Sequence, residues 1–525
     1  MTQQQPTLQQ ALNQGSQLLQ SGQLEQAQRL VELLIERFPE QIAVRLFAAD
    51  TAMMRGDVAA AASSLEAVPE SAPDYVRVIL YKARLAFADA RRSEAMQLAE
   101  TARKGVAGKP ELMRMLASVM RDCQQMEQAH ELLLQALQLA PEHVGLLYDV
   151  AMAEYHLNEP DAGEDHLATL LQKAPYHAGA LHLRSALRTQ SAERNHIDDL
   201  QQTLAKGPKQ PQVLAAANYA LAKELEDLGN YEESVLALEA GARAYRSTLR
   251  YDLGPELAAH EEIRNTFNQA RFAELPSGFG QEQPIFVVGM PRTGTTLAER
   301  IIATHSQAVS IGEFTEFPRL YGQRLQAQLE RNANSSPSEA ALHIDFAELG
   351  QAYCTAARDL AGEASVFVDK LPFNFLYCGY ILAALPNARL IHLVRDPLDT
   401  CYAIYKTLFF GAYSFSYDLD ELASYYISYH QHMAHWRTVM PGRILDVHYE
   451  DLVRDPENQA RRIIEWCGLP WESAVLDFHR RKDAALTASA MQVRQPVHTA
   501  SIGSWRRAET LLEPLQARLA AAGLI

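Results

Sequence analysis

The sequence of 525 residues is poor in cysteine and has no long apolar run. Its five cysteines form neither CxxC pairs nor a zinc-like spacing, so we expect reduced thiols, no disulfide framework and no metal site. Nowhere do the roughly 18 uncharged apolar residues of a membrane span follow one another, and the first residues do not resemble a signal peptide. These absences predict a soluble, cytoplasmic protein that has no membrane partner.

Positive charge is scarce as well, with 48 Lys and Arg against 64 Asp and Glu and a net charge of -16. This balance opposes broad electrostatic binding to nucleic acid or to anionic lipid. Any anionic ligand must therefore be held by a local cluster of cations. A hydrophobic content of 48% provides material for large cores, and the length predicts more than one domain.

The first half of the chain has a period of 34 residues. Small residues recur in one phase, at Ala27, Ala61, Ala95, Ala129 and Gly163, and prolines recur in another, at Pro39, Pro73, Pro141 and Pro175. A small residue lets two antiparallel helices approach closely, and a proline ends the second helix of the pair. This pattern resembles tetratricopeptide repeats. A plain helical bundle is the alternative, although it does not explain the constant period.

The repeat pattern fits well from Leu8 to Leu183, loses its phase over 184–212, and returns around Gly229 and Ser234. We therefore predict an α-solenoid of tetratricopeptide-like helical repeats over residues 8–250. Such arrays present a surface to other proteins, so a protein or peptide is the expected partner. The sequence leaves that partner and the oligomeric state open.

A change of pattern follows the repeats. Prolines and glycines are frequent near the end of residues 251–283, which we interpret as a linker. From there on, short apolar runs at 284–289, 365–369, 389–394 and 443–449 alternate with helical stretches. This alternation predicts a three-layer α/β domain with a central parallel sheet over residues 284–525.

The first of these strands leads into the most informative segment, PIFVVGMPRTGTTLAER. A strand, a glycine-containing turn and a helix can direct backbone amides at an anion. The turn and helix start comprise Pro291, Arg292, Thr293, Gly294, Thr295 and Thr296. Thr295 stands where a nucleotide-hydrolysing P-loop has lysine, which argues against a conventional ATPase. A tight turn without a ligand is the alternative, but it does not explain a cation and three hydroxyls on one turn.

These residues resemble the sulfotransferase family, and within it the tyrosylprotein and tetratricopeptide-linked sulfotransferases, over about 284–507. The resemblance implies 3'-phosphoadenosine 5'-phosphosulfate as co-substrate, 3',5'-bisphosphoadenosine as product, and no metal. It also implies that Arg395, in RLIHLVRDPLD, binds the 3'-phosphate. The family usually has a serine eight residues later, where this chain has Ala403. Unless Thr400, Tyr402 or a water replaces that hydroxyl, we expect donor affinity lower by roughly one to two decades.

The same resemblance implies the catalytic residues. Glu313 would accept the proton of the acceptor hydroxyl, whereas Lys370 and Arg292 would stabilise charge on the leaving group. Glu316 is a weaker candidate for the base and is expected to pair with Arg319. The C-terminal stretch implies a last donor-binding loop with Gly503, Trp505 and Arg506, to which Arg494 would add a charge. Core or structural roles are expected for His305, His392, Tyr449, Glu450 and Asp451.

Together these features predict transfer of a sulfuryl group to an acceptor hydroxyl, with a protein or peptide favoured over carbohydrate or lipid. Two alternatives remain open. One is a non-catalytic repeat scaffold whose degenerate sulfotransferase domain only binds nucleotide, as the loss of a hydroxyl at Ala403 would allow. The other is a kinase with a degenerate P-loop, which Thr295 disfavours.

Overall fold

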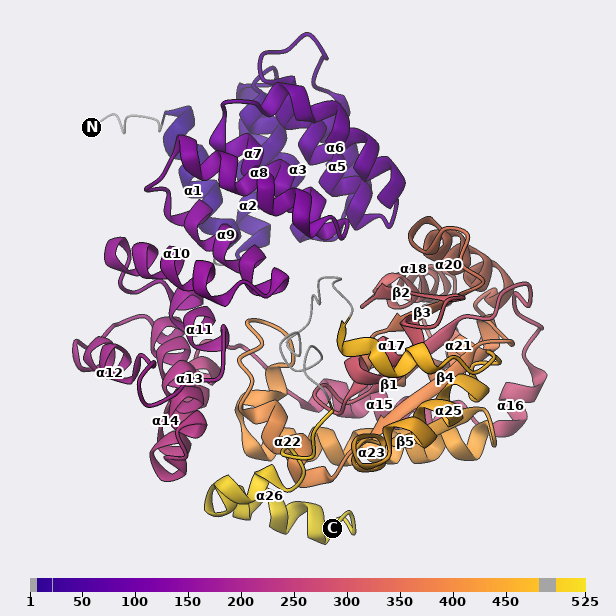
Figure 1. Cartoon of the computed structure of the whole chain (residues 1–525). Helices are drawn as coiled ribbons and strands as arrows, with labels where there is room; N and C mark the ends of the chain where they lie inside the picture. The colour runs from indigo at the N-terminus through magenta and orange to yellow at the C-terminus, as the bar shows by residue number, and fades with distance from the viewer. Residues whose placement is uncertain (1–6, 21, 481–496) are drawn as a thin grey trace. The chain divides into compact units, whose positions relative to one another are not determined.

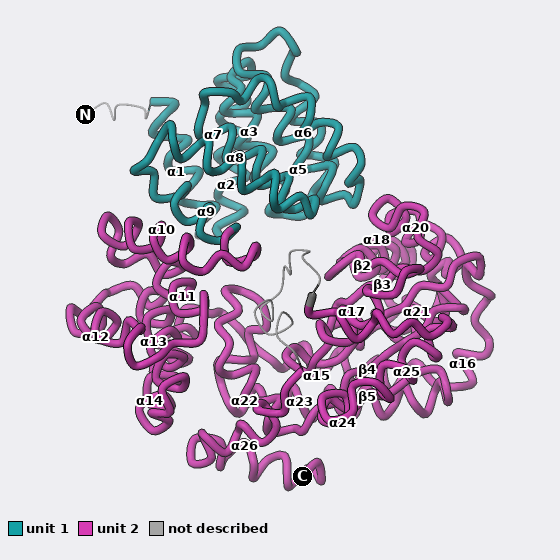
Figure 2. Tube along the Cα trace, viewed as in Figure 1, with its two compact units in different colours: residues 1–153 teal, residues 154–525 magenta. Residues whose placement is uncertain are grey.

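The computed structural model describes residues 7–20, 22–480 and 497–525. The chain divides into two compact units, Met1–Ala153 and Glu154–Ile525 (Figure 2). Each unit has its own hydrophobic cores.

The first unit consists of antiparallel helix pairs (Figure 1). Each small residue of the predicted period within this unit is fully buried at a helix contact. Pro39 and Pro141 each lie two residues beyond the end of a helix, as the pattern predicts. The helices are α1 (Leu8–Gln20), α2 (Leu24–Arg37), α3 (Ile42–Met54), α4 (Val58–Glu66), α5 (Tyr75–Ala88), α6 (Arg92–Val106), α7 (Pro110–Asp122), α8 (Met126–Leu139) and α9 (Val144–Leu157), which extends past residue 153.

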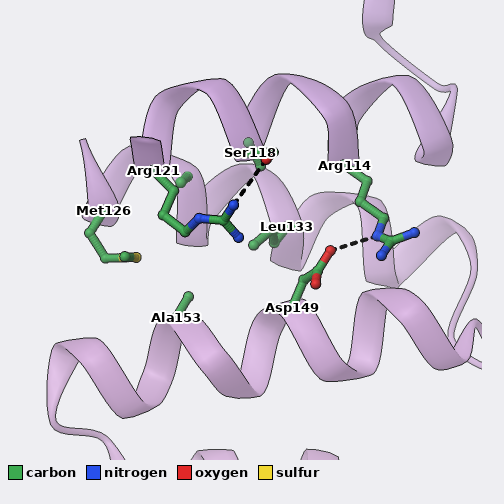
Figure 3. Close-up of a pocket in the computed structure, with 9 residues that line it drawn as sticks. Arg114, Ser118, Arg121, Met126, Leu133, Asp149 and Ala153 are labelled. Carbon is green, nitrogen blue, oxygen red and sulfur yellow. Dashed lines mark hydrogen bonds and ion pairs between the residues drawn. The ribbon is translucent and has the colours of Figure 1, made fainter. Parts of the chain in front are cut away.

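Successive helices of this unit are joined by polar contacts as well as apolar ones. Figure 3 shows a small hollow between α7, α8 and α9, lined by apolar side chains such as Met126 and Leu133. At its edge, Arg114 Nε donates to Asp149 Oδ2 over 2.6 Å. An ion pair between α7 and α9 therefore fixes how neighbouring repeats stack.

The helical pattern continues at the start of the second unit. Gly163 is buried in α10, and Pro175 lies two residues beyond its end. The turn between α13 and α14 contains Gly229, whose φ of +83° favours glycine, and Ser234 is buried as the small residue of this late repeat. The helices are α10 (Pro160–Lys173), α11 (Ala178–Ala186), α12 (Ile197–Ala205), α13 (Pro211–Asp227) and α14 (Tyr231–Arg246).

A parallel five-stranded sheet in the order β2-β3-β1-β4-β5 forms the centre of the second unit. Side chains alternate between its faces: Ile285 and Val287 pack with the cluster around α17 and α25, whereas Phe286 and Val288 pack with the opposite cluster, which includes α20, α21 and α23. The strands are β1 (Ile285–Gly289), β2 (Ala308–Gly312), β3 (Val366–Lys370), β4 (Arg389–Val394) and β5 (Ile444–His448). The predicted three-layer α/β fold is confirmed.

The helices that cover this sheet are α17 (Thr295–Ala303), α18 (Glu316–Arg331), α19 (Pro337–Ala341), α20 (Phe346–Ala361), α21 (Cys378–Ala384), α22 (Pro397–Tyr405), α23 (Leu419–Val439), α24 (Tyr449–Arg454), α25 (Pro456–Trp466) and α26 (Glu509–Ala521). Within the described ranges, four short 3-10 helices accompany them: η1 (Pro372–Tyr377), η2 (Ser414–Tyr417), η3 (Ser473–Arg480) and η5 (Ser504–Ala508). In the described part of the chain, no helix combines the length and the apolarity needed to cross a membrane.

The segment 251–283 contains two helices, α15 (Gly254–Thr266) and α16 (Gln269–Glu274). They pack against α23, where His260 Nδ1 lies 3.0 Å from Ser428 Oγ and His435 Nε2 lies 2.7 Å from the Phe267 carbonyl. The boundary between the two compact units lies at 153/154, so α13 and α14 belong to the same unit as the sheet. α13 contacts the sheet domain directly, since the Tyr219 hydroxyl donates to the Tyr405 carbonyl over 3.1 Å. The boundaries at 250 and 283 remain a prediction.

A partly buried carboxylate links α13 to the sheet domain. Glu226 accepts from Lys406 Nζ at 2.9 and 3.0 Å and from Arg507 NH1 at 3.0 Å. Its side chain is 13% exposed. Although burial opposes it, Lys406 and Arg507 hold the pKa of Glu226 below its usual value.

We expect Glu226→Ala to lower the free energy of unfolding of the second unit by about 1–2 kcal/mol, because it leaves two partly exposed cations, Lys406 and Arg507, without their carboxylate. Glu239→Ala is the control, since Glu239 pairs with Arg243 within an exposed turn of α14 and should change stability by less than about 1 kcal/mol. Urea unfolding followed by tryptophan fluorescence measures both, because all four tryptophans lie beyond residue 435. Equal effects would contradict the role of Glu226.

Candidate active site

Two glycines of the turn after β1 lie too close to neighbouring atoms for a larger residue. Gly289 has a φ of +147°, and a Cβ there would lie 2.8 Å from the Leu393 carbonyl. Gly294 has a φ of +96°, and a Cβ there would lie 2.6 Å from the Tyr449 ring. Both positions therefore require glycine.

The turn also has the features of an anion-binding site. Arg292 has a φ of +67°, which is uncommon for a residue other than glycine and often marks a functional turn. Among the residues that the structure describes, no acceptor is within reach of the amides of Gly294, Thr295 and Thr296. These amides begin α17, where the helix dipole favours a negative charge. Pro291, Thr293, Thr295 and Thr296 are buried, and Arg292 and Gly294 are half-buried.

Arg395 brings a second cation to this turn. It follows β4 and is 7% exposed. Its NH1 donates to the Arg292 carbonyl over 2.9 Å, and its NH2 donates to the Ser501 carbonyl over 2.7 Å. Burial, and then the charge of Arg395, lower the pKa of Arg292 to about 10. An anion beside these two guanidinium groups would offset their repulsion.

The C-terminal loop is held to α22 by a buried aspartate that sequence reasoning missed. Asp399 is fully buried and accepts from the Gly503 amide at 2.6 Å, the Trp505 amide at 3.0 Å and the Ser504 hydroxyl at 3.0 Å. Asp399 comes one turn after the N-cap residue Asp396. Nothing in the local sequence separates it from an ordinary acidic residue of a first helical turn.

The residues predicted for the C-terminal loop lie at or next to its contacts with Asp399. Gly503 has a φ of +71°, Trp505 is half-buried, and Arg506 is exposed with its guanidinium 4.8 Å from the Trp505 ring centre. Arg494 lies outside the described residues.

The interpretation of Tyr449 as structural was incomplete. Its ring lies under the Arg395 guanidinium at 4.9 Å, and its hydroxyl is 2.7 Å from Ser501 Oγ. A cation against an aromatic face gains electrostatic stabilisation. Glu450 supports the same corner, because its carboxylate accepts from the Asp396 amide at 2.9 Å. Tyr449 therefore helps to orient Arg395.

At the carboxyl ends of β2 and β3, the structure brings together the predicted base and the predicted lysine. Lys370 is 1% exposed and donates to Glu313, and its ammonium lies 3.8 Å from the Glu299 carboxylate of α17. The Glu313 side chain is 41% exposed and so remains accessible. An ammonium has three donors, and of these two contacts only the one to Glu313 is within hydrogen-bond distance.

One further prediction concerns this edge of the sheet. Glu316 is buried and ion-paired with Arg319, whose Nε lies 2.8 Å from Oε2, as expected. Tyr413 lies close enough to Glu313 to be affected by its charge, and its half-buried ring packs against those of Phe373 and Phe409 with ring centres 4.7 and 4.6 Å apart. Burial, and then the Glu313 charge, raise the pKa of Tyr413.

Ala403 is buried in α22, where the resembling enzymes have serine. Of the residues expected to replace its hydroxyl, Thr400 is buried, with Oγ1 3.4 Å from the Arg395 carbonyl, whereas the Tyr402 ring packs under Lys406 at 4.8 Å. His305 and His392 are each 2% exposed and hydrogen-bonded, in agreement with their expected core roles.

The fold and the turn define a class of protein: a parallel α/β domain that presents a P-loop-like anion site without the lysine of nucleotide hydrolases. Comparison with known proteins narrows the class. Residues 284–473 match the sulfotransferase family, and residues 18–85 match the tetratricopeptide repeat. The chain therefore contains a sulfotransferase-family domain preceded by tetratricopeptide repeats, which confirms the predicted resemblance.

The chain is also similar to individual proteins. An uncharacterized protein of Aquifex aeolicus is 30% identical over 74% of this chain and 52% of its own length. The protein-tyrosine sulfotransferase of Drosophila melanogaster is 26% identical over 43% of this chain and 48% of its own. The chain thus spans about half the length of these relatives. A solved sulfotransferase domain from the olefin synthase of Synechococcus PCC 7002 is 21% identical, with a TM-score of 0.34 over 44% of this chain and 90% of that one.

We predict that Gly294→Ala destabilises the sheet domain by about 1–3 kcal/mol, because alanine is strained at this positive φ and would contact the Tyr449 ring. Gly322→Ala is the matched control. Gly322 lies inside α18 with open space around it, so alanine there should stabilise by about 0.5–1 kcal/mol. Urea unfolding followed by tryptophan fluorescence gives both values. A neutral Gly294→Ala would show that the turn is not constrained as described.

A second prediction concerns Asp369, next to Lys370. Asp369 is fully buried and accepts from the Tyr353 hydroxyl at 2.8 Å, whereas its Oδ1 has no partner within the described ranges. Burial raises the pKa of this carboxyl to about 8. A raised pKa means that the folded protein holds a proton which the unfolded chain releases. Its contribution to stability is therefore complete below about pH 4 and is lost as the pH rises through about 8.

Asp369→Asn keeps an acceptor for Tyr353 but does not ionise. The free energy of unfolding of the wild type should fall as the pH rises from 5 to 8, whereas that of the variant should not fall for this reason. We therefore expect the difference, variant minus wild type, to increase by about 1 kcal/mol or more over this range. Urea unfolding at both pH values measures this difference. If the difference between the two proteins does not change with pH, Asp369 ionises at its ordinary pKa.

Proposed function

We propose that this protein transfers a sulfuryl group from 3'-phosphoadenosine 5'-phosphosulfate to an acceptor hydroxyl. The observation on which this rests most is the pair of cations, half-buried Arg292 and buried Arg395, at a lysine-free P-loop-like turn. The match of residues 284–473 to the sulfotransferase family supports it.

In this proposal the donor's two ends bind to different segments. The amides of the turn, the Thr295 and Thr296 hydroxyls and Arg292 bind the 5'-phosphosulfate at the start of α17. Arg395 binds the 3'-phosphate. Gly503, Trp505 and Arg506 bind the donor from the C-terminal loop, which Asp399 holds in place.

The reaction is an in-line displacement at sulfur. The acceptor oxygen forms the new bond to sulfur as the bond from sulfur to the 5'-phosphate oxygen breaks, which releases 3',5'-bisphosphoadenosine. Glu313 accepts the acceptor proton, and its exposed carboxylate is accessible to an incoming hydroxyl. Lys370 and Arg292 stabilise the negative charge that develops on the leaving phosphate. No step requires a metal ion.

A protein or peptide is the acceptor that the observations favour. Tetratricopeptide repeats support a protein partner. Several relatives have names that describe protein-tyrosine sulfotransferases. The Tyr413 ring, which is affected by the Glu313 charge and packs against Phe373 and Phe409, suits an acceptor with a flat apolar part.

A lipid hydroxyl is a second candidate for the acceptor. Over 108 residues the chain is 32% identical to a Mycobacterium tuberculosis protein named omega-hydroxy-beta-dihydromenaquinone-9 sulfotransferase Stf3. The cytoplasmic location expected from the sequence remains a prediction.

Glu313→Gln tests the reaction. With radiolabelled donor and a panel of tyrosine peptides, glycans and hydroxylated lipids, we expect the wild type to label one class. Glu313→Gln should lower this rate at least about 100-fold, because general base catalysis supplies roughly 10²–10⁴-fold. Donor affinity should stay within about threefold. Glu316→Gln, with its melting temperature checked, should retain most of the rate because Glu316 pairs with Arg319.

Full activity of Glu313→Gln would exclude Glu313 as the base. If the wild type binds 3',5'-bisphosphoadenosine but labels nothing in the panel, the scaffold alternative gains support.

A further inference from the structure

A bulge in β2 determines which residue comes beside Lys370. Ser310 of β2 pairs with the residue two positions before Lys370 on β3, whereas Gly312 pairs with the residue immediately before it. The strand β2 therefore has one residue more than β3 over this stretch. In a regular pairing, Gly312 would lie opposite Lys370. The bulge instead brings Glu313, the proposed base, to this place, and β-bulges commonly redirect a side chain next to an active site.

Ser310 stabilises this bulge through its hydroxyl. The Ser310 Oγ accepts from the Gly312 amide at 3.0 Å, and Gly312 has a positive φ of +76°, which favours glycine. The same hydroxyl donates to Glu299 Oε1 of α17. Because an amide only donates and an ionised carboxylate only accepts, the direction of both bonds is fixed. Sequence analysis assigned no role to Ser310 or Glu299.

The second oxygen of Glu299 faces Lys370. Glu299 Oε2 lies 3.8 Å from Lys370 Nζ, and the same ammonium donates to Glu313. Lys370 is 1% exposed and Glu299 is 7% exposed, so dissolved salt screens this ion pair little. Glu299 lies four residues after Thr295, in the helix whose first amides bind the 5'-phosphosulfate in the proposed function. One helix thus provides these amides and the carboxylate that holds Lys370.

These contacts form a ring around the proposed base and lysine. From Glu313 it passes through the bulge and Ser310 to Glu299. From Glu299 it returns through Lys370 to Glu313. We propose that Ser310 and Glu299 are positioning residues: Ser310 maintains the bulge that places Glu313, and Glu299 holds the ammonium of Lys370 beside it. This inference rests on the proposed function, and neither residue is expected to touch the donor or the acceptor.

Ser310→Ala tests the first part of this role. The assay follows labelled sulfate from 3'-phosphoadenosine 5'-phosphosulfate to the panel of acceptors and to water. We expect kcat to fall about tenfold, because a misplacement of about 1 Å can cost up to 100-fold. The dissociation constant of 3',5'-bisphosphoadenosine, from isothermal titration, should change less than about threefold. Ser310→Thr restores a hydroxyl and should recover at least half of the rate.

Ser306→Ala is the matched control. Ser306 lies just before β2, and its hydroxyl also donates to a glutamate, Glu472. This pair is at the other end of the strand from Glu313, so the substitution should change kcat less than about twofold. A merely structural role for Ser310 would weaken nucleotide binding together with kcat.

Glu299→Gln tests the second part. The amide keeps an acceptor for Ser310 but has no charge to hold Lys370. We expect kcat to fall about tenfold, whereas the affinity for 3',5'-bisphosphoadenosine should not decrease. Because both residues act on one pair, the double variant should lose no more than about threefold beyond the worse single variant.

Several results would overturn the inference and leave the proposed function intact. They are an unchanged kcat in Ser310→Ala or Glu299→Gln, an equal loss of nucleotide binding, or losses that multiply in the double variant. Failure of the unmodified protein to transfer sulfate to any acceptor or to water would contradict both.

Discussion

The Arg395 guanidinium joins three segments that are far apart in the sequence, and the arrangement of the site depends on it. It donates to the Arg292 carbonyl of the turn after β1 and to the Ser501 carbonyl of the C-terminal loop. Its face lies against the Tyr449 ring that follows β5. The planar, permanently charged group can form all three contacts at once, whereas lysine could not. Burial, and then the charge of Arg395, lower the pKa of Arg292. The two cations therefore favour an anion at this turn as well as fixing its shape.

A chain of net charge -16 thus concentrates cations at one place in its second unit. Four cations of the second unit are involved: Arg292, Arg395, Lys406 and Arg507. Glu226 of α13 accepts hydrogen bonds from Lys406 and Arg507 and offsets their charge. Desolvated like charges are costly unless they are compensated. In this domain the compensation comes partly from a helix of the repeat pattern, which explains why α13 and α14 group with the sheet domain rather than with the first unit.

Local signals made most of the fold predictable. These signals depend on residues close in sequence: the 34-residue period, the four apolar runs and the glycines of the turn. In the structure, Ala27 and Ala129 are fully buried and Gly294 has a positive φ, as the patterns predict. The missed residues act over long separations. Asp399 bonds the Gly503 amide 104 residues away, and Glu226 bonds Lys406 180 residues away. A carboxylate with such a partner looks like a surface residue in the sequence. The roles of Glu313 and Lys370 came from a family resemblance, and the structure adds their contact.

The central claim is that two apposed arginines at a lysine-free turn bind the donor's phosphates without metal. Isothermal titration of the full chain with 3',5'-bisphosphoadenosine, ADP and ATP, each with and without Mg²⁺, tests it most directly. The account predicts tight binding of 3',5'-bisphosphoadenosine that is unaffected by Mg²⁺ and at least about tenfold tighter than that of ADP, since the 3'-phosphate adds a charged contact. Preference for ATP with Mg²⁺ would contradict it and favour a phosphoryl-transfer enzyme.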